Sequence, residues 1–378
     1  MITVGAVGDL ILDEPDPDSF LAPAAPVLRG MDLAIGHIEV PHSTTTVQRS
    51  TDVPAPPADP AALKAVSAAG FHVATLAGNH IYDAGDEGLA DTIAHARAAG
   101  LETAGAGPDL AAARRPAVVE RGGLRFAVLS YNCVGPRDSW ATSRKPGCAY
   151  VRVLTHYELD HASPGGPPEV FTFADPASLA LMEEDVRRAR ADADVVLVSL
   201  HKGVGHTPAV VAMYESPVAR AAIDAGADAV FSHHAHIMRG IEVHRGRPIF
   251  HGLGNFVTVT HALTPSAGTG ADELRAWAER RTKLYGFAPD PDMPYYPFHP
   301  ESRNTAIAVC RFDENGLREA GFVPCRIDDA GRPVPVGGTP EGAEVTRYIE
   351  DITREAGLNG RFTAHGAEVR IDLSGGDQ

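Results

Sequence analysis

The sequence has 378 residues, of which 44% are hydrophobic and 22% charged, and these proportions are ordinary for a soluble globular protein. Its formal net charge of −16 argues against a nucleic-acid or anionic-membrane partner, because such partners bind surplus lysine and arginine. Nowhere do 18 apolar residues run together, so we expect no membrane span.

The N-terminal segment and the cysteines both favour a cytoplasmic protein. MITVGAVGDLILDE has no basic region ahead of its apolar run and turns acidic at Asp13, unlike a secretory signal. The cysteines, Cys133, Cys148, Cys310 and Cys325, form no C-x-x-C pair, so free thiols are expected. A bridge between Cys310 and Cys325, which fall on neighbouring strand-like runs, stays open.

Short apolar runs alternate with segments of helical length through the first part of the chain, as in β-α-β units. The strand-like runs are residues 2–8, 31–37, 72–78, 124–131, 194–200 and 228–232. The helical segments are residues 60–70, 86–99, 176–191 and 209–225. We therefore predict a layered α/β fold built on mixed sheets.

The later part of the chain changes character and reads as antiparallel strands joined by short turns. These strands are residues 240–246, 247–252, 303–312 and 316–327. Helices are expected near 270–284 and 340–356, and the polar tail after Asp372 is expected to be frayed.

Three segments interrupt the pattern, near residues 44–60, 135–172 and 262–300, and the first two are too irregular or too rich in proline and glycine for regular elements. Long loops inside a compact domain are usually mobile or functional. We interpret these segments as rim and lid insertions over a site, within a single domain that spans residues 1–378.

Polar side chains of metal-binding types directly follow five of the apolar runs. They are Asp9, Glu39, Asn79 with His80, His201, and His234 with His236. Ligands of α/β sheets bind at the carboxyl edge of the strands, where the loops diverge. We therefore expect these side chains to meet in one cleft.

The donor set predicts a site for one or two divalent ions. Carboxylate, amide and imidazole ligands without thiolate suit Mn²⁺, Fe²⁺ or Zn²⁺, with Ca²⁺ and Mg²⁺ left open. Such a set is large enough for a two-metal hydrolytic centre. No nucleotide or organic cofactor is expected, and the sequence leaves the oligomeric state open.

Six motifs resemble one known family. They are GDLIL (8–12), IEVP (38–41), AGNHIYDAGDEGLADT (77–92), SLHKG (199–203), the block from Ile223 to Phe256 that contains HHAH and GLGNF, and YPFHPESRNTAIA (296–308). They are similar to the CapA/PgsA-type proteins, which are named for poly-γ-glutamate capsule synthesis and belong to the calcineurin-like metallophosphoesterase superfamily. The resemblance implies a four-layer α/β/β/α sandwich with mixed sheets and a dinuclear metal centre.

The resemblance also implies roles for individual residues. Asp9 resembles the first metal aspartate, and Glu39 resembles a carboxylate that bridges two ions. His80 resembles the unligated histidine that acts as general acid or contacts the substrate anion. The remaining implied ligands are Asn79, His201, His234 and His236. The chain departs from the family pattern at three positions, with Ile11 in place of a histidine, His37 in place of an asparagine and Lys202 in place of a tryptophan.

Three functions are compatible with the sequence. The first is metal-assisted hydrolysis or transfer at a phosphoester, peptide or γ-glutamyl bond of a peptide or small anionic substrate. The second is epimerisation of a peptide Cα in ribosomal-peptide natural-product biosynthesis, through a metal-stabilised enolate. The acid and base of that reaction would come from His80, His37, Asp9 and His299. The third is a binding scaffold without catalysis.

Residues of the two later motifs are candidates for substrate contact. Arg303 could grip a substrate carboxylate beside Glu301, with His299 reaching across as acid or base. The alternative is that Glu301 and Arg303 pair with each other while His299 packs against Tyr295 or Phe298. Asn255, in GLGNF, is expected beside the site as a turn former or substrate contact.

Overall fold

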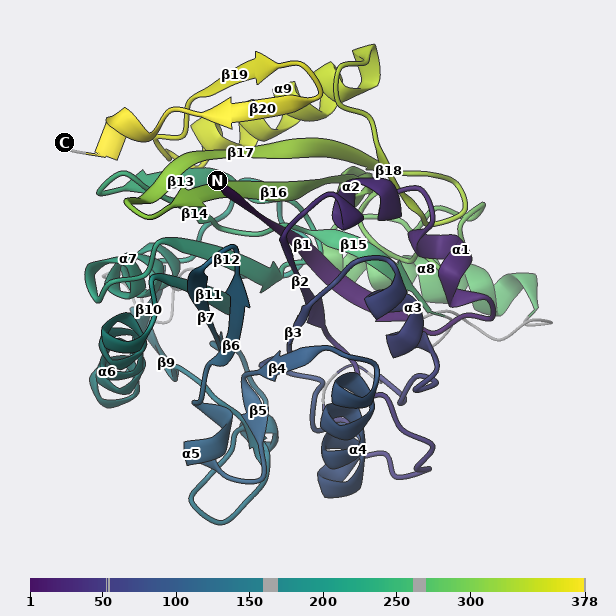
Figure 1. The fold of residues 1–378 in the computed structure, drawn as a ribbon. Helices are drawn as coiled ribbons and strands as arrows, with labels where there is room; N and C mark the ends of the chain where they lie inside the picture. The colour runs from purple at the N-terminus through teal and green to yellow at the C-terminus, as the bar shows by residue number, and fades with distance from the viewer. Residues whose placement is uncertain (52, 54, 159–168, 261–269, 377–378) are drawn as a thin grey trace.

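Two β-sheets stacked face to face form the centre of the molecule, and helices cover the outer face of each sheet (Figure 1). This computed structural model describes residues 1–51, 53, 55–158, 169–260 and 270–376. The predicted four-layer α/β/β/α arrangement with mixed sheets is therefore what the chain adopts.

The larger sheet has ten strands in the described part of the chain. Near its middle, β1 (Ile2–Leu12) pairs in parallel with β2 (Leu33–Ile38) and β15 (Asn255–Val259). β1 also pairs antiparallel with β16 (Asn304–Asp313). The other strands of this sheet are β3 (Val73–Thr75), β4 (Glu102–Ala104), β17 (Gly316–Ile327), β18 (Pro333–Pro335), β19 (Phe362–His365) and β20 (Glu368–Ile371).

The smaller sheet has six strands in order β13-β14-β12-β11-β7-β6. Its four central strands run parallel, and the two edge strands run antiparallel to their neighbours. The strands are β6 (Ala117–Arg121), β7 (Leu124–Asn132), β11 (Val195–Lys202), β12 (Ala229–His234), β13 (Ile241–His244) and β14 (Arg247–Phe250).

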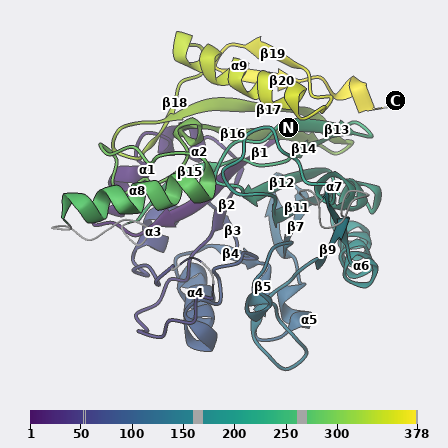
Figure 2. The same cartoon turned by 180° about the vertical axis from the view of Figure 1, so that it is seen from behind.

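Helices cover both sheets. α1 (Pro17–Leu21), α2 (Ala25–Arg29), α3 (Ala62–Ala68) and α4 (Gly85–Ala98) pack on the larger sheet. α6 (Pro176–Asp192) and α7 (Glu215–Asp224) pack on the smaller one. The remaining helices are α5 (Leu110–Ala113), α8 (Ala271–Tyr285) and α9 (Pro340–Glu355). α8 has no buried residue and lies at the surface (Figure 2).

The apolar runs are nearly continuous because most central strands are buried on both faces. In β2, Leu33 and Ile35 point into the core between the sheets, whereas Ala34 and Ile38 point toward the helices. Successive side chains of a strand point to opposite faces. A strand between two covered faces therefore needs apolar residues at every position, which removes the alternation expected of a half-exposed strand.

The six apolar runs of the first part and the six longer helical segments are all present, with ends shifted by a few residues. The prediction that 135–172 lacks regular elements is wrong. It contains β8 (Gly147–Cys148), which pairs with β5 (Ala106–Gly107), and the hairpin of β9 (Val153–Glu158) and β10 (Glu169–Ala174). Residues 159–168 and 262–269 of the predicted insertions lie outside the described residues.

All four cysteines are free and buried. Cys310 of β16 pairs with Ala320 of β17, whereas Cys325 pairs with Thr305. The two thiols are thus offset along the ladder. They also lie in different cores, Cys310 between the sheets and Cys325 toward the helices, which excludes a bridge in this fold.

Two other expectations concern the tail and the membrane. The tail after Asp372 forms a short 3₁₀ turn at Leu373–Gly376, and residues 377–378 lie outside the described part. Among the described helices, none combines the length and the apolarity that a bilayer crossing requires.

The close approach of Gly8 to β15 predicts a strong effect of a single methyl group. A Cβ on Gly8 would lie 1.9 Å from the carbonyl oxygen of Gly254. Gly8→Ala should lower the free energy of unfolding by about 1–3 kcal/mol, because the two strands must move apart. Chemical denaturation measures this change. Gly270→Ala is the control, since nothing lies within 4 Å of its Cβ position, and equal stability of the two variants would contradict the explanation.

Candidate metal centre

The candidate ligands come from strands of both sheets and meet at one edge. Asp9 lies inside β1, at a bulge where the register with β15 shifts between Asp9 and Leu10. The prediction that Asp9 follows the end of its strand is therefore wrong, because β1 continues to Leu12. A bulge re-aims a side chain without ending the strand. His201 lies inside β11, and His234 is the last residue of β12.

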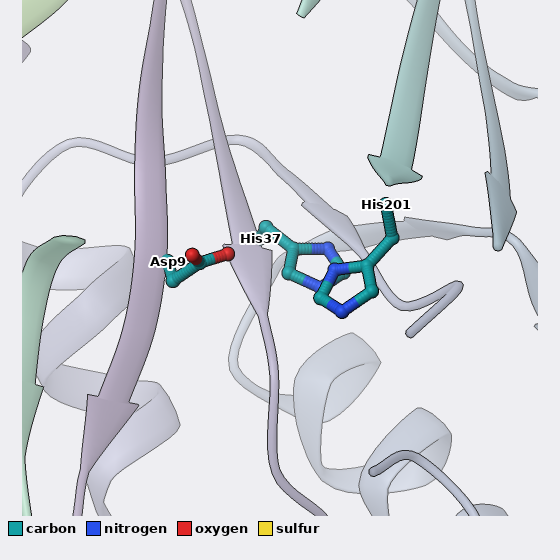
Figure 3. Close-up of side chains that lie close together, drawn as sticks. All are labelled: Asp9, His37 and His201. Carbon is teal, nitrogen blue, oxygen red and sulfur yellow. The ribbon is translucent and has the colours of Figure 1, made fainter. Parts of the chain in front are cut away.

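Two groups of donor atoms share Asp9. In one group, Asp9, His37 and His201 place ligand atoms within 4.8 Å of one another. In Figure 3, the Asp9 carboxylate of the larger sheet faces the neighbouring rings of His37 and His201, which are tilted by 34° to each other. In the other group, Asp9, Glu39 and His236 do the same. Asp9 is thus the residue that the two groups share, and the bridging role that the family resemblance implied for Glu39 stays a prediction.

The predicted amide ligand and two imidazoles form a third convergence. The Oδ1 atom of Asn79 lies 2.8 Å from Nε2 of His201, and that nitrogen lies 3.1 Å from Nδ1 of His234. The structure therefore brings together Asp9, Glu39, Asn79, His201, His234 and His236, and it adds His37 as a seventh donor. His37 and Glu39 are two residues apart on one strand direction, which puts their side chains on the same face.

Several buried atoms of this cluster lack a hydrogen-bond partner within the described part of the chain. They are Oε2 of Glu39, Nε2 of His37 and Nδ1 of His201. Asp9, Glu39, His37 and His201 are all 0% exposed. A buried polar atom without a partner costs about 1–3 kcal/mol. Oxygen and nitrogen lone pairs left bare in one place are what a divalent cation would satisfy, so the residues fit a metal site.

Electrostatics of the free site also suit cations. Burial lowers the pKa of His37 and of His201 well below the ordinary value and lowers the pKa of His234 to about 4. These imidazoles are therefore neutral at pH 7 and able to coordinate. Burial, and then the charge of Glu39, raise the pKa of Asp9 well above its ordinary value. Two carboxylates in a dry site repel each other until positive charge is supplied.

Glu39 and His236 form a largely buried ion pair. The Oε1 atom of Glu39 lies 3.2 Å from Nε2 of His236. Burial opposes both ionised forms, but the pairing outweighs it, so the pKa of Glu39 falls to about 2 and the pKa of His236 rises to about 9. A proton on His236 thus occupies a place that a metal ion would take.

Surrounding residues orient the imidazoles. Nδ1 of His236 donates to Oδ1 of Asn255 at 2.8 Å, and Nδ2 of Asn255 donates to the Tyr296 hydroxyl at 3.1 Å. Nδ1 of His37 lies 3.1 Å from the Thr75 hydroxyl. Such contacts fix the tautomer and leave the other ring nitrogen for a metal. Asn255, predicted as a turn former or substrate contact, therefore holds a candidate ligand in place.

A cavity of about 250 Å³ opens beside the cluster. Among the cluster residues, Asn79, His80, His234 and His236 line it, whereas the other donors lie behind them. Segment 44–60 contributes Val53, Ala55 and Pro56, and segment 262–300 contributes Arg281, Tyr285 and Phe298. No described residue of 135–172 lines this cavity.

His80 faces this cavity with a carboxylate behind it. Its Nδ1 donates to Oδ2 of Asp83 at 2.7 Å. Its Nε2 lies 3.0 Å from Nδ2 of Asn79, so the same amide that offers oxygen to the ligand cluster contacts His80 through nitrogen. This arrangement is typical of an imidazole that transfers protons.

The other predicted contacts lie elsewhere. None of His299, Glu301 and Arg303 is among the residues that line the cavity. Arg303 donates to Oδ1 of Asp329 at 2.7 Å, and Nδ1 of His299 accepts from the Glu301 amide at 3.1 Å. The His299 ring contacts Phe287, with centroids 5.1 Å apart. Sequence reasoning missed His206, Arg281 and Tyr285, because these residues follow no strand.

Comparison with known proteins identifies relatives of this chain. Residues 3–260 match the family model PGA_cap, described as bacterial capsule synthesis protein. A probable polyglutamine synthesis accessory protein of Mycobacterium tuberculosis is 35% identical over 193 residues, covering 49% of this chain and 45% of its own. The capsule biosynthesis protein CapA of Bacillus anthracis is 27% identical and covers 68% of this chain and 59% of its own. The chain therefore spans about half the length of the curated relatives it matches.

One solved structure is similar over most of its length. The calcineurin-like phosphoesterase YfkN of Bacillus subtilis is 15% identical, with a TM-score of 0.41, and the match covers 94% of this chain and 97% of that one.

The donor groups predict that the chain binds divalent cations. Glu39→Gln and His37→Gln should each raise the Kd for Mn²⁺ or Zn²⁺ by at least about tenfold, because each removes a buried ligand. Titration calorimetry and metal analysis measure this. His95→Gln, which changes an exposed histidine of α4, should bind like the unchanged chain. Unaltered affinity in both ligand variants would contradict the assignment.

Metal affinity should also depend on pH. With the pKa of His236 raised to about 9, the free site carries a proton there at neutral pH, and cation binding must displace it. The Kd for Mn²⁺ should therefore rise by about tenfold for each unit of falling pH below that value. Calorimetry in buffers of different ionisation enthalpy counts the released protons. A Kd that does not change with pH would show that His236 is not displaced.

Proposed function

We propose that this chain, which belongs to the PGA_cap family of bacterial capsule synthesis proteins, is a divalent-metal-dependent hydrolase. The resemblance to CapA-type proteins predicted from the motifs is confirmed by this match and by the named relatives. The substrate class is a phosphoester or a peptide or γ-glutamyl amide. The observation that carries the proposal is the pair of buried donor groups sharing Asp9 beside a cavity that His80 lines.

The cluster supports this chemistry through its placement. Divalent cations, when bound, supply Lewis acidity and make water acidic enough to ionise near neutral pH. Asp9, Glu39 and the imidazoles would hold them at the back of the cavity, out of reach of bulk water. Asn79, His234 and His236 lie at the boundary between the donors and the cavity, where the scissile bond would sit.

His80 is the proposed proton donor to the leaving group. Asp83 holds its Nδ1 proton, which directs Nε2 as the atom that gives and recovers a proton. A positioned imidazole of this kind contributes about 10²–10⁴-fold to a rate. The role needs His80 to face the cavity without being a ligand, and its place on the cavity lining with Nδ1 bonded to Asp83 supports that.

Epimerisation is less well supported. That reaction needs an acid and a base on opposite faces of one carbon. Of its four candidates, only His80 is a lining residue of the cavity, whereas Asp9 and His37 are fully buried behind it and His299 does not line it. Hydrolysis needs a single proton donor beside the donor groups, which the cavity provides.

The names of the relatives indicate the first substrates to test. Those proteins are called capsule or PGA biosynthesis proteins and polyglutamine synthesis accessory proteins. An oligomer with γ-glutamyl bonds is therefore the first candidate, and an aryl phosphodiester is the second. A cytoplasmic location is part of the proposal and is supported by the four free thiols.

The proposal predicts hydrolysis that depends on both metal and His80. The Mn²⁺-loaded chain should cleave γ-glutamyl oligomers or bis(4-nitrophenyl) phosphate, as followed by mass spectrometry and by 4-nitrophenolate release. His80→Asn should lower kcat by about 10²–10⁴-fold and leave the bound metal unchanged, because it removes a proton donor and no ligand. His95→Asn is the matched control.

Running the reaction on peptides in D₂O separates the alternatives. Cleavage supports hydrolysis. Deuterium uptake at Cα without cleavage would replace the proposal with epimerisation. Loss of metal in His80→Asn would refute its role as an unligated proton donor.

A further inference from the structure

One arginine beside the cavity has no acidic partner among the residues that the structure describes. Arg281, on α8, is one of the lining residues. Its Nη2 donates to the Pro297 carbonyl at 2.9 Å, and its Nε is buried without an acceptor. Within the described ranges, no carboxylate pairs with it, although the chain carries 49 acidic residues against 33 basic ones.

Other shielded arginines of the described chain differ in their partners. Arg239 is 1% exposed and contacts only the Val204 carbonyl and the Thr207 hydroxyl, away from this cavity, whereas two partly buried arginines form ion pairs. Arg114 makes an ion pair with Asp185, with Nε 2.6 Å from a carboxylate oxygen. Arg190 does the same with Asp228 at 2.8 Å. A charge shielded from water is normally paired. An unpaired guanidinium next to a cavity is therefore a place where an anion from outside gains a partner.

Aromatic rings hold Arg281 in place. Its guanidinium carbon lies 4.9 Å from the ring centre of Tyr285 and 5.8 Å from that of Trp277. These three residues are spaced four apart, so they share one face of α8. The rings limit the rotamers of Arg281 and displace water from it, which strengthens its attraction for an anion.

His206 connects this region to the candidate metal centre. Its ring stacks on His236 with centroids 5.6 Å apart and contacts Tyr285 with centroids 5.0 Å apart. His206 adopts a left-handed backbone conformation, φ 58°, and lines the cavity. Arg281 and the donor groups therefore lie beside the same cavity, separated by the rings of Tyr285 and His206.

The rest of the cavity wall is mostly apolar, although Asp13 and Thr260 also line it. Its apolar residues include Ile11, Val40, Val53, Ala55 and Phe298. A substrate without apolar groups would gain nothing from contact with these side chains, whereas an apolar group would remove their surface from water. The wall thus favours a ligand that carries an apolar body in addition to an anionic group.

We propose that Arg281 binds a carboxylate or phosphate group at the non-reacting end of the substrate, while the apolar wall holds the apolar body between that group and the donor cluster. This inference rests on the proposed function for the identity of the reacting end. Arg281 is then a specificity-determining residue. A guanidinium can bind either anion through two parallel hydrogen bonds, which an ammonium cannot do.

Three small probes and two neighbouring arginines test the inference. The Mn²⁺-loaded full chain is titrated by calorimetry with 3-phenylpropionate, with 2-phenylethyl phosphate and with the neutral 3-phenylpropionamide. At least one anion should bind about tenfold or more tightly than the amide, and Arg281→Gln should remove about tenfold of that preference. Arg280→Gln, which removes an exposed charge one position away, should retain it.

The outcomes assign the anion and separate this inference from the proposed function. Preference for the carboxylate or for the phosphate supports the site and names its ligand. A full preference retained in Arg281→Gln overturns the inference, even if Mn²⁺ binds and hydrolysis proceeds. Conversely, an anion preference that depends on Arg281 in a chain that holds no Mn²⁺ supports this site and overturns the proposed function.

A purely structural role for Arg281 is tested by a second variant. Arg281→Lys keeps the positive charge and loses the two-pronged geometry. An intermediate preference, with a thermal midpoint close to that of the unchanged chain, supports anion binding. If Arg281→Gln and Arg281→Lys lower the midpoint alike and leave the ratio of anion to amide affinity unchanged, Arg281 only stabilises α8 and the inference fails.

Discussion

The exclusion of water from a cluster of carboxylates and imidazoles is the constraint on which the rest of the site depends. Asp9 and Glu39 are fully buried, and the charge of Glu39 adds to burial in raising the pKa of Asp9. Without cations, the chain manages this charge with a proton on His236. The bulge in β1 and the contact between His236 and Asn255 hold the donor atoms close together. Positive charge bound among these atoms would stabilise that arrangement.

A buried lysine next to the cluster is neutralised by a carboxylate. Lys202 stands beside His201 at the position where the family resemblance implied a tryptophan, and it is 0% exposed. Its Nζ lies 2.7 Å from Glu215 and 3.0 Å from Nδ1 of His251. An unpaired ammonium so close would repel cations from the donor groups. The glutamate cancels that effect, so the substitution is compatible with a metal centre.

The candidate ligands could be predicted from the sequence because polar residues interrupt or follow the apolar runs, although Asp9 and His201 lie inside their strands and not past the ends. Details that depend on pairing could not. The bulge at Asp9 arises from contact with β15, which lies far away in the sequence. The sharing of Asp9 between two groups, and His37 as a donor, follow from sheet packing. Arg281 was invisible because helical spacing reveals which residues share a face but not which cavity that face meets.

The pairing of β1 with β16 has a consequence for dividing this protein. The family match stops at residue 260, yet β16 begins at Asn304 and lies directly against the strand that carries Asp9. Cutting the chain at residue 260 would strip β1 of this neighbour and leave an unpaired strand edge in the larger sheet. The end of the family match at residue 260 is therefore not a position at which the polypeptide can be truncated.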